Sequence, residues 1–178
     1  MKVKYSDLKN KRVFITGGGS GIGGSIVEHF CEQGSEVYFV DINLKETKKL
    51  LNKIKTNKFR TPTFIECNLL DISKLEKIIK NIITKKGPIH ALINNAANDD
   101  RHTTDQVDEK YWENRMAINL KHYFFAAKSV VKSMKKMKAG SIVNLSSVSW
   151  MLGEGDKVVY ETAKSAVVGL TRSFAQEY

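Results

Sequence analysis

The sequence predicts an α/β fold built on a doubly wound parallel sheet with the strand order 3-2-1-4-5. Short runs of β-branched and aromatic residues alternate with amphipathic stretches, each run closes on a turn signal, and a glycine-rich loop follows the first run. A β-α-β series of this kind forms one sheet with helices on both faces, because its crossovers are right-handed. With 178 residues, 42% of them hydrophobic, the chain is expected to form a single domain over residues 1–178.

The predicted strands are the apolar runs, and the first of them leads directly into the glycine-rich loop. In chain order they are Arg12–Thr16, Glu36–Val40, Thr63–Cys67, Ala91–Asn94 and Ser141–Leu145. In a sheet of this order, ligands bind at the carboxyl ends of the strands, near the switch between strands 1 and 4. A binding site is therefore expected in the residues that follow these runs.

Helices are predicted in the gaps between the runs. Ile72–Thr84 is the clearest, because its isoleucine and leucine residues recur at three- and four-residue spacing on one face. Asp71 is expected to cap its start, and Gly87-Pro88 to end it. Two longer helical regions are expected from about Val107 to Met137 and from about Val159 to the C-terminus, with a loop between them marked by Gly153 and Gly155.

The composition argues against nucleic-acid and membrane partners. The net charge is +10, but the lysines are spread along predicted helices, and the densest group is interpreted as a solvated helix end: Lys132, Lys135, Lys136 and Lys138. Met1–Lys11 lacks the apolar core of a secretory signal and no apolar stretch has the length of a membrane span, so a cytoplasmic protein is expected. Cys31, Cys67 and the histidines show no metal-site spacing, and the cysteines are expected to be reduced core residues.

The loop Gly17-Gly18-Gly19-Ser20-Gly21-Ile22-Gly23 is predicted to bind a pyrophosphate. It opens a helix that starts near Gly21, and the free N–H groups and partial positive charge of a helix start favour phosphate. Glycine is required because side chains would block the turn and keep the backbone from the ligand. Two alternatives stay open: a merely flexible turn, or a fingerprint in another register at Gly19, Gly21 and Gly24.

Asp41 ends the second strand eighteen residues after Gly23, where a carboxylate can accept both hydroxyls of an adenosine ribose. The same carboxylate would repel a 2′-phosphate, and no arginine stands at Ser20 or Ile42 to attract one. The predicted cofactor is therefore NAD rather than NADP. The alternative role for Asp41 is a helix cap for the stretch that starts near Asn43.

Tyr160 and Lys164 lie one helical turn apart, so the ammonium can approach the phenol and stabilise its phenolate form. The spacing alone is not specific, because Tyr5 and Lys9 share it in a polar stretch. Ser147 closes the fifth strand, where its hydroxyl can meet a substrate oxygen. A phenol of this kind, combined with a dinucleotide site, favours hydride transfer.

These residues resemble the short-chain dehydrogenase/reductase family in its NAD-preferring form, which has a Rossmann-type fold. The motifs that carry the resemblance are Thr16-Gly17-x-x-x-Gly21-x-Gly23, Asp41, Asn94-Asn95-Ala96, Asn119, Ser147 and Tyr160-x-x-x-Lys164. The resemblance implies that Tyr160 is the catalytic acid/base and that Lys164 lowers its pKa and binds the nicotinamide ribose. It also implies that Ser147 orients the reacting oxygen and that Asn119 holds a water for proton relay. Seen alone, Asn119 could instead cap or kink a helix, and Asn94-Asn95 could be a turn.

The resemblance also implies which residues contact the cofactor. These are Gly17, Ser20, Gly21, Ile22, Gly23, Asp41, Ile42, Asn68, Leu69, Asn95, Ala96, Tyr160 and Lys164. Asn68 stands where the family has an aspartate against adenine, and an asparagine can still hydrogen-bond that base. Ala97 stands where the family commonly has glycine, which is a small change.

Residues 96–102 and 147–152 are similar to the sugar-oxidising branch of the family, which implies a secondary alcohol, sugar or sugar acid as substrate. Asn98, His102, Ser149 and Trp150 are the candidate substrate residues, with polar groups at the pocket mouth and an aromatic face from Trp150. The alternative for Arg101 and His102 is a solvated loop. No metal ligand is expected among these residues.

The resemblance further implies two more strands, a substrate-covering segment and a nicotinamide-contacting loop after Tyr178. We therefore expect a C-terminally truncated member or part of a longer protein, with little or no turnover because its pocket lacks a wall. The alternative function is a catalytically incomplete NAD-binding protein that acts as a sensor or partner. The two long helical regions form the oligomer interface in relatives, so a homo-oligomer, dimer or tetramer, is expected.

Overall fold

Five parallel strands form one sheet in the order β3-β2-β1-β4-β5, which confirms the predicted order. The strands are β1 (Arg12–Thr16), β2 (Glu36–Asp41), β3 (Thr63–Glu66), β4 (Ala91–Asn94) and β5 (Ser141–Asn144). They differ from the predicted runs by at most one residue at the end of a strand. The computed structural model describes residues 3–178, so Met1 and Lys2 of the N-terminal stretch lie outside the described residues.

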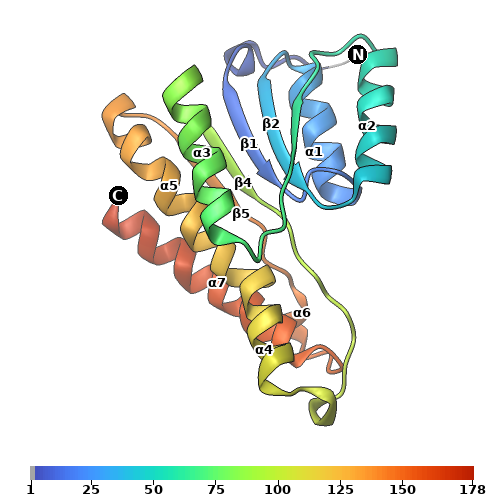
Figure 1. Ribbon diagram of the computed structural model, residues 1–178. Helices are drawn as coiled ribbons and strands as arrows, with labels where there is room; N and C mark the ends of the chain where they lie inside the picture. Colours follow the sequence, from blue (N-terminus) through green and yellow to red (C-terminus); the bar gives the residue numbers. More distant parts are fainter. Residues whose placement is uncertain (1–2) are drawn as a thin grey trace.

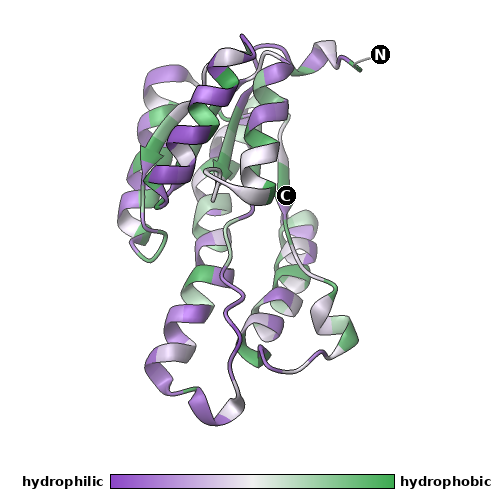
Figure 2. Cartoon of the chain, turned by 90° about the vertical axis from the view of Figure 1, so that its right-hand side faces the viewer, coloured by the Kyte–Doolittle hydropathy of each residue, from purple (hydrophilic) through white to green (hydrophobic). Residues whose placement is uncertain are grey.

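Helices cover both faces of the sheet, as Figure 1 shows. Helices α1 (Gly21–Glu32) and α2 (Leu44–Thr56) pack on one face, and α3 (Ile72–Lys86) and α5 (His122–Met137) pack on the other. Alternate residues of β1 point to opposite sides: Val13 and Ile15 join the core under α1 and α2, whereas Phe14 joins the core under α3 and α5. In Figure 2 the strands are predominantly hydrophobic and the helices carry both kinds of residue, as the layered core requires.

The caps predicted around α3 are present. The side chain of Asp71 accepts a hydrogen bond from the Lys74 N–H at 2.9 Å, and Gly87 ends the helix with a φ of 98° that favours glycine. The helix runs to Lys86, two residues beyond the predicted end. Cys31 and Cys67 are both free and buried.

The helical region predicted from about Val107 to Met137 is not one continuous helix. It consists of α4 (Glu109–Met116), a π-helical turn (Ala117–Lys121) and α5. The π-helical turn holds an extra residue, which leaves no signature in the hydrophobic spacing. Asn119 lies in the middle of this turn and is fully buried.

The C-terminal part contains the short helix α6 (Ser149–Leu152), which the sequence pattern did not predict, and the long helix α7 (Val158–Glu177). Short 3-10 turns cover Ser6–Leu8 and Thr104–Gln106. Figure 1 shows α4 and α6 beyond the carboxyl ends of the strands, where a ligand site is expected. Across residues 3–178, no helix is both long enough and apolar enough to cross a bilayer.

Candidate active site

The glycine loop lies between β1 and α1, and its backbone is packed too closely for a side chain at Gly17, Gly18, Gly19 and Gly23. A Cβ on Gly23 would lie 1.9 Å from the Gly17 carbonyl oxygen, and Gly17 itself has a φ of 66°. Ser20 caps α1 in an extended conformation without a side-chain cap hydrogen bond, and Ile22 is exposed. The start of α1 therefore offers N–H groups to an anion. The close packing of the loop backbone favours a pyrophosphate-binding loop over the alternative of a merely flexible turn.

Asp41 connects the end of β2 to the glycine loop. Its Oδ2 accepts the Gly19 N–H at 2.7 Å, and its Oδ1 accepts the N–H groups of Ile42 and Asn43, both at 2.8 Å. The alternative that Asp41 caps α2 is wrong, because Asn43 is the cap and accepts the Glu46 N–H at 3.1 Å. The carboxylate thus stands beside the glycine loop, where an adenosine ribose would lie.

Asn95 joins the loop after β4 to the glycine loop. Its Nδ2 donates to the carbonyl oxygens of Thr16 at 3.1 Å and Gly17 at 3.0 Å. The Thr16 hydroxyl oxygen accepts the N–H groups of Asn95 and Ala96 at 3.1 and 3.2 Å. These bonds hold Ala96 against Gly17, on the side of the glycine loop opposite Asp41.

The adenine end of the predicted cofactor site lies after β3. Asn68 is exposed and its side-chain oxygen accepts the Leu70 N–H at 3.0 Å. The side chain of Leu69 is buried in the core under α3 and α5, so the exposed groups of this segment are those of Asn68 and Leu70.

Lys164 lies on α7 and extends its ammonium into the protein towards the end of β5. Its Nζ donates to the Tyr123 hydroxyl and to the Leu145 carbonyl oxygen, both at 2.8 Å, and lies 5.7 Å from the Tyr160 ring centroid. Burial lowers the pKa of Lys164 to about 8, an effect that the negative charge of Asp99 partly opposes. The predicted pair of Tyr160 and Lys164 is therefore brought together at the carboxyl end of the sheet.

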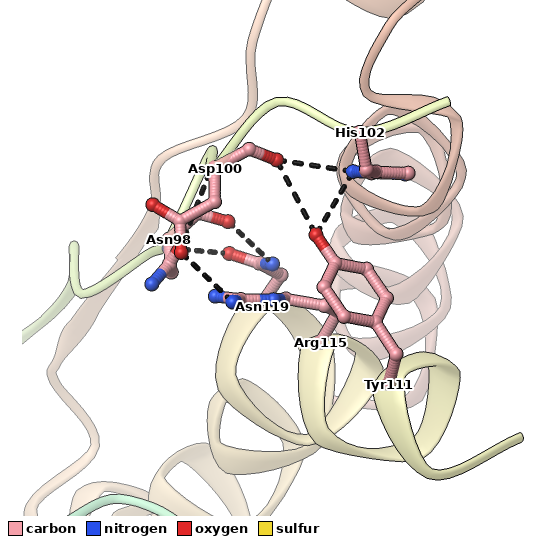
Figure 3. A network of polar contacts seen from close by, with 6 residues as sticks. All are labelled: Asn98, Asp100, His102, Tyr111, Arg115 and Asn119. Carbon is pink, nitrogen blue, oxygen red and sulfur yellow. Dashed lines mark hydrogen bonds and ion pairs between the residues drawn. The ribbon is translucent and has the colours of Figure 1, made fainter. Parts of the chain in front are cut away.

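Asn119 binds the backbone of the loop that follows β4. Its Oδ1 accepts the Asn98 N–H at 2.8 Å, and its Nδ2 donates to the Asn98 carbonyl oxygen at 2.9 Å. Figure 3 shows that the hydrogen bonds continue from Asn98 to Asp100, whose Oδ2 accepts a hydrogen bond from Arg115 Nη2 on α4 at 2.8 Å. The side-chain amide of Asn119 thus fixes the loop on which the candidate substrate residue Asn98 lies.

The ring of His102 is buried, so the alternative that it is solvated is wrong. Its Nε2 contacts the Val159 N–H at 3.4 Å, and its Nδ1 contacts the Tyr111 hydroxyl at 2.9 Å (Figure 3). Because an N–H group only donates, Nε2 is the acceptor and Nδ1 carries the hydrogen. His102 therefore fastens this loop to the first turn of α7, one residue before Tyr160, whereas Arg101 is exposed and pairs with Asp156 at 2.6 Å.

The loop after β5 carries the other candidate residues. The hydroxyls of Ser147 and Ser149 lie 2.9 Å apart, and the neighbouring Ser146 hydroxyl donates to the Lys164 carbonyl oxygen at 2.7 Å. Ser149 is buried at the start of α6, whereas Trp150 is partly exposed. The bond from Ser146 fixes this loop on α7, beside the turn that carries Tyr160.

Comparison with known proteins identifies the family. The profile described as short chain dehydrogenase matches residues 11–178. The chain belongs to the short-chain dehydrogenase family. Its relatives include the D-xylose 1-dehydrogenase of Caulobacter vibrioides, which is 40% identical over 173 residues that cover 97% of this chain and 68% of the relative.

Two further relatives of this dehydrogenase are also named for sugars. The glucose and ribitol dehydrogenase of Daucus carota is 31% identical over 175 residues, which cover 94% of this chain and 60% of the relative. The ligand-free structure of the Thermoplasma acidophilum aldohexose dehydrogenase is 30% identical, with a TM-score of 0.85 and coverage of 98% of this chain and 64% of that chain. The chain thus spans about two thirds of the length of such relatives, and the resemblance to the sugar branch is confirmed.

Members of this family bind a nicotinamide dinucleotide, and the residues of the dehydrogenase fit one. The start of α1 and the closely packed glycines of its loop suit the pyrophosphate, and the Asp41 carboxylate suits a ribose. Sequence reasoning missed three residues that support the site: Tyr111, Arg115 and Tyr123. Their helical positions were predicted, but their partners lie on other elements and no local spacing indicates such contacts.

Proposed function

We propose that this dehydrogenase transfers hydride between NAD and a secondary alcohol or sugar hemiacetal, giving the carbonyl or lactone. The observation that carries the proposal is the buried Lys164 ammonium, 5.7 Å from the Tyr160 ring and fixed at the end of β5. A cation at this position favours the phenolate form of Tyr160. The Tyr160 phenolate and the glycine loop then both lie at the carboxyl ends of the strands.

In the oxidative direction, the Tyr160 phenolate takes the proton of the substrate hydroxyl. The Ser147 hydroxyl orients the reacting oxygen, and the Lys164 ammonium stabilises the negative charge on the Tyr160 oxygen and binds the nicotinamide ribose. Asn119 holds the Asn98 loop through its side chain. In this proposal it also holds the water molecule of the proton relay. When bound, the nicotinamide ring supplies the acceptor for the hydride.

NAD is proposed as the cofactor because of Asp41. The carboxylate accepts backbone N–H groups of Gly19, Ile42 and Asn43 and is therefore held beside the glycine loop. A 2′-phosphate at this position would meet a fixed negative charge, whereas ribose hydroxyls would find an acceptor. Ile42 is exposed and offers no positive charge to compensate.

The proposed substrate is a sugar or sugar acid, in keeping with the names of the relatives. Asn98 is partly exposed on the loop after β4 and Trp150 is partly exposed in α6, and the Ser149 hydroxyl contacts that of Ser147. Polar groups and an aromatic face suit a polyhydroxylated ring. His102 acts in this proposal through the loop and α7, because its ring is enclosed by protein.

Self-association through α5 and α7 belongs to the same proposal. Phe124 and Val168 expose apolar surface on these helices, at 41% and 36% of their full area. Burial of this surface against a second copy would remove it from water. Light scattering coupled to size-exclusion chromatography is expected to give a dimer or tetramer, and a monomer at all concentrations would exclude it.

A substrate screen tests the proposed function. The protein is titrated with NAD and with NADP and is then mixed with a panel of aldoses, sugar acids and polyols while NADH absorbance is followed. We expect NAD to bind more tightly than NADP, and we expect NAD to be reduced to NADH in the presence of at least one sugar. NAD binding without turnover on any substrate would favour the alternative, a nucleotide-binding sensor, and lack of binding of either dinucleotide would overturn the proposal.

A further inference from the structure

The ammonium of Lys164 lies between two tyrosine rings. Its Nζ is 4.9 Å from the ring centroid of Tyr123 and 5.7 Å from that of Tyr160. Tyr160 shares α7 with the lysine, whereas Tyr123 belongs to α5 and is fully buried. Among residues 3–178, the Tyr123 hydroxyl is the only hydroxyl that hydrogen-bonds the ammonium, at 2.8 Å.

The direction of the hydrogen bonds at Tyr123 follows from its partners. The ammonium of Lys164 can only donate, so the Tyr123 oxygen accepts. The hydroxyl hydrogen then goes to the Leu145 carbonyl oxygen at 3.1 Å, the same atom that Lys164 contacts at 2.8 Å. Lysine, tyrosine and carbonyl therefore form a closed triangle at the end of β5.

This arrangement does not suit Tyr123 for proton transfer. Its hydrogen faces carbonyl oxygens, Leu145 at 3.1 Å and Ala96 at 3.4 Å, and a backbone carbonyl does not hold a proton. Burial raises the pKa of the Tyr123 hydroxyl, and the negative form of Tyr160 nearby raises it further. The hydroxyl is therefore a fixed acceptor rather than an acid or base.

We propose that Tyr123 is a positioning residue that holds the Lys164 side chain, in its charged form, next to Tyr160. This proposal rests on the proposed role of Lys164 and adds a residue from a different helix to that role. The oxygen of Tyr123 favours the ammonium over the neutral amine, because a hydrogen bond from a charged donor is stronger than one from a neutral donor. The face of its ring adds a second favourable interaction with the cation.

Tyr123 is itself held in place. Its backbone carbonyl oxygen accepts a hydrogen bond from Asn94 Nδ2 at 3.3 Å, and Asn94 also binds Asn144 Oδ1 at 2.8 Å. The ring packs edge-on against that of His122 at 4.5 Å. The triangle is thus fixed to β4, β5 and α5 together, and Lys164 cannot move without losing its contacts to Tyr123 on α5 and to Leu145 after β5.

The charge of Lys164 is sensitive to its surroundings. Burial lowers its pKa to about 8, and the carboxylate of Asp99 is the group that raises it. The other titratable groups that face it are Tyr160, Tyr123 and His122, and His122 is neutral because burial and the nearby lysine lower its pKa to about 3. Loss of the Tyr123 oxygen would therefore lower the pKa of Lys164 further, and a smaller fraction would be charged near neutral pH.

The test compares Tyr123→Phe with Tyr38→Phe. Both variants remove one hydroxyl from a buried ring, but the Tyr38 hydroxyl donates to Glu36 in β2, away from the site. The lysine side chains are labelled with ¹³Cε and titrated by NMR, and the Lys164 signal is assigned by its absence in Lys164→Arg. We expect an apparent pKa lower by about one unit in Tyr123→Phe and no change in Tyr38→Phe. An unchanged Lys164 titration in folded Tyr123→Phe would overturn the proposal.

Activity gives an independent readout. In Tyr123→Phe the alkaline limb of the kcat profile should move to lower pH by the same amount, with the Kd for NAD changed by less than about threefold. A purely structural role would lower activity at every pH without moving this limb, and that result would overturn the proposal. If the wild-type protein turns over no substrate, the proposed function fails, but the lysine titration still decides the role of Tyr123.

A second measurement covers the case in which Tyr123→Phe does not fold. The ¹³Cζ signal of Tyr123 is compared between the wild-type protein and Lys164→Met. A hydroxyl that accepts a bond from an ammonium should change its chemical shift when the ammonium is removed. No change at Tyr123 would contradict the contact on which the proposal is built.

Discussion

Asn119 binds both backbone polar groups of Asn98 through its side-chain amide, at 2.8 and 2.9 Å. The two residues come from different elements, since Asn119 lies in the π-helical turn and Asn98 in the loop after β4. An asparagine can make this double contact because it carries one acceptor and one donor group side by side. The pair therefore couples the turn in the helix to the loop that borders the proposed substrate site.

Replacement of Asn119 by alanine should loosen this loop. The N–H and carbonyl groups of Asn98 would lose their partners, which should lower the free energy of unfolding by about 1–3 kcal/mol. Turnover should fall as well, because the backbone at Asn98 would no longer be held. Urea denaturation and steady-state kinetics measure both effects, with the exposed Asn114→Ala as the control. Wild-type stability and activity in Asn119→Ala would contradict the role assigned to the amide.

Two glycines of the chain give a matched pair of substitutions. A Cβ on Gly23 would lie 1.9 Å from the Gly17 oxygen and 2.5 Å from Asn95 Nδ2, whereas a Cβ on Gly169 in α7 meets no atom within 4 Å. Gly23→Ala should therefore lower stability by about 1–3 kcal/mol and abolish dinucleotide binding. Gly169→Ala should raise stability by up to about 1 kcal/mol, because alanine favours the helix.

Thermal unfolding and NAD titration of both variants check this prediction. The contrast between them is the informative quantity, since each variant adds one methyl group. Equal stability of the two proteins, or normal NAD binding by Gly23→Ala, would show that the glycine loop is not packed as the structure has it.

Replacement of Asp41 by serine should change the choice of cofactor. The serine hydroxyl can still bind a backbone N–H but no longer repels a 2′-phosphate, so the ratio of NADP to NAD affinity should rise on the order of 10- to 100-fold. Dissociation constants for both dinucleotides measure the ratio at low and high salt. The exposed Asp7→Ser removes the same charge elsewhere and should leave the ratio unchanged. An unaltered ratio in Asp41→Ser would assign the selectivity to other residues.

His122 should make stability depend on pH in the acidic range. Burial and the nearby Lys164 lower the pKa of His122 from 6.5 to about 3, so the folded protein keeps the ring neutral while the unfolded chain takes up a proton below about pH 6.5. Proton uptake then favours the unfolded chain, and stability is lost as the pH falls from about 6.5 to about 3. From this one group, the free energy of unfolding falls by up to about 1.4 kcal/mol for each pH unit in this range.

The difference between His122→Gln and the wild-type protein isolates this contribution, because the carboxyl groups titrate in both. The free energy of unfolding of His122→Gln should fall less steeply below about pH 6.5, whereas the exposed His29→Gln should follow the wild type. If the free energy of unfolding changes with pH in parallel for His122→Gln and wild type, the buried ring is not the source of the acid sensitivity.

Local patterns predicted the elements and the sheet. The β-branched run of β1, the spacing of isoleucines in α3 and the cap at Asp71 depend on neighbours in sequence, and the structure has them where they were expected. The positions of the candidate residues at the strand ends followed from the strand order. Parallel order itself followed from the alternation of strands and helices.

Contacts between distant elements could not be predicted in the same way. Tyr123 has the sequence signature of a core aromatic residue, and only the packing of α5 against α7 brings its hydroxyl to Lys164. His102 was open to a solvated interpretation because its partners, Tyr111 and Val159, lie on two other helices. The extra residue of the π-helical turn around Asn119 was missed because it changes the helix without changing the apolar pattern.

The most direct measurement is made on Tyr160→Phe, with NAD affinity by calorimetry and turnover by NADH absorbance on the substrate that the wild-type protein oxidises. The variant keeps the ring and loses only the hydroxyl that takes the proton. We predict a Kd for NAD within about twofold of wild type and a kcat reduced by about 100- to 10,000-fold. A Tyr160→Phe protein that turns over at the wild-type rate would contradict the catalytic role of the tyrosine beside Lys164.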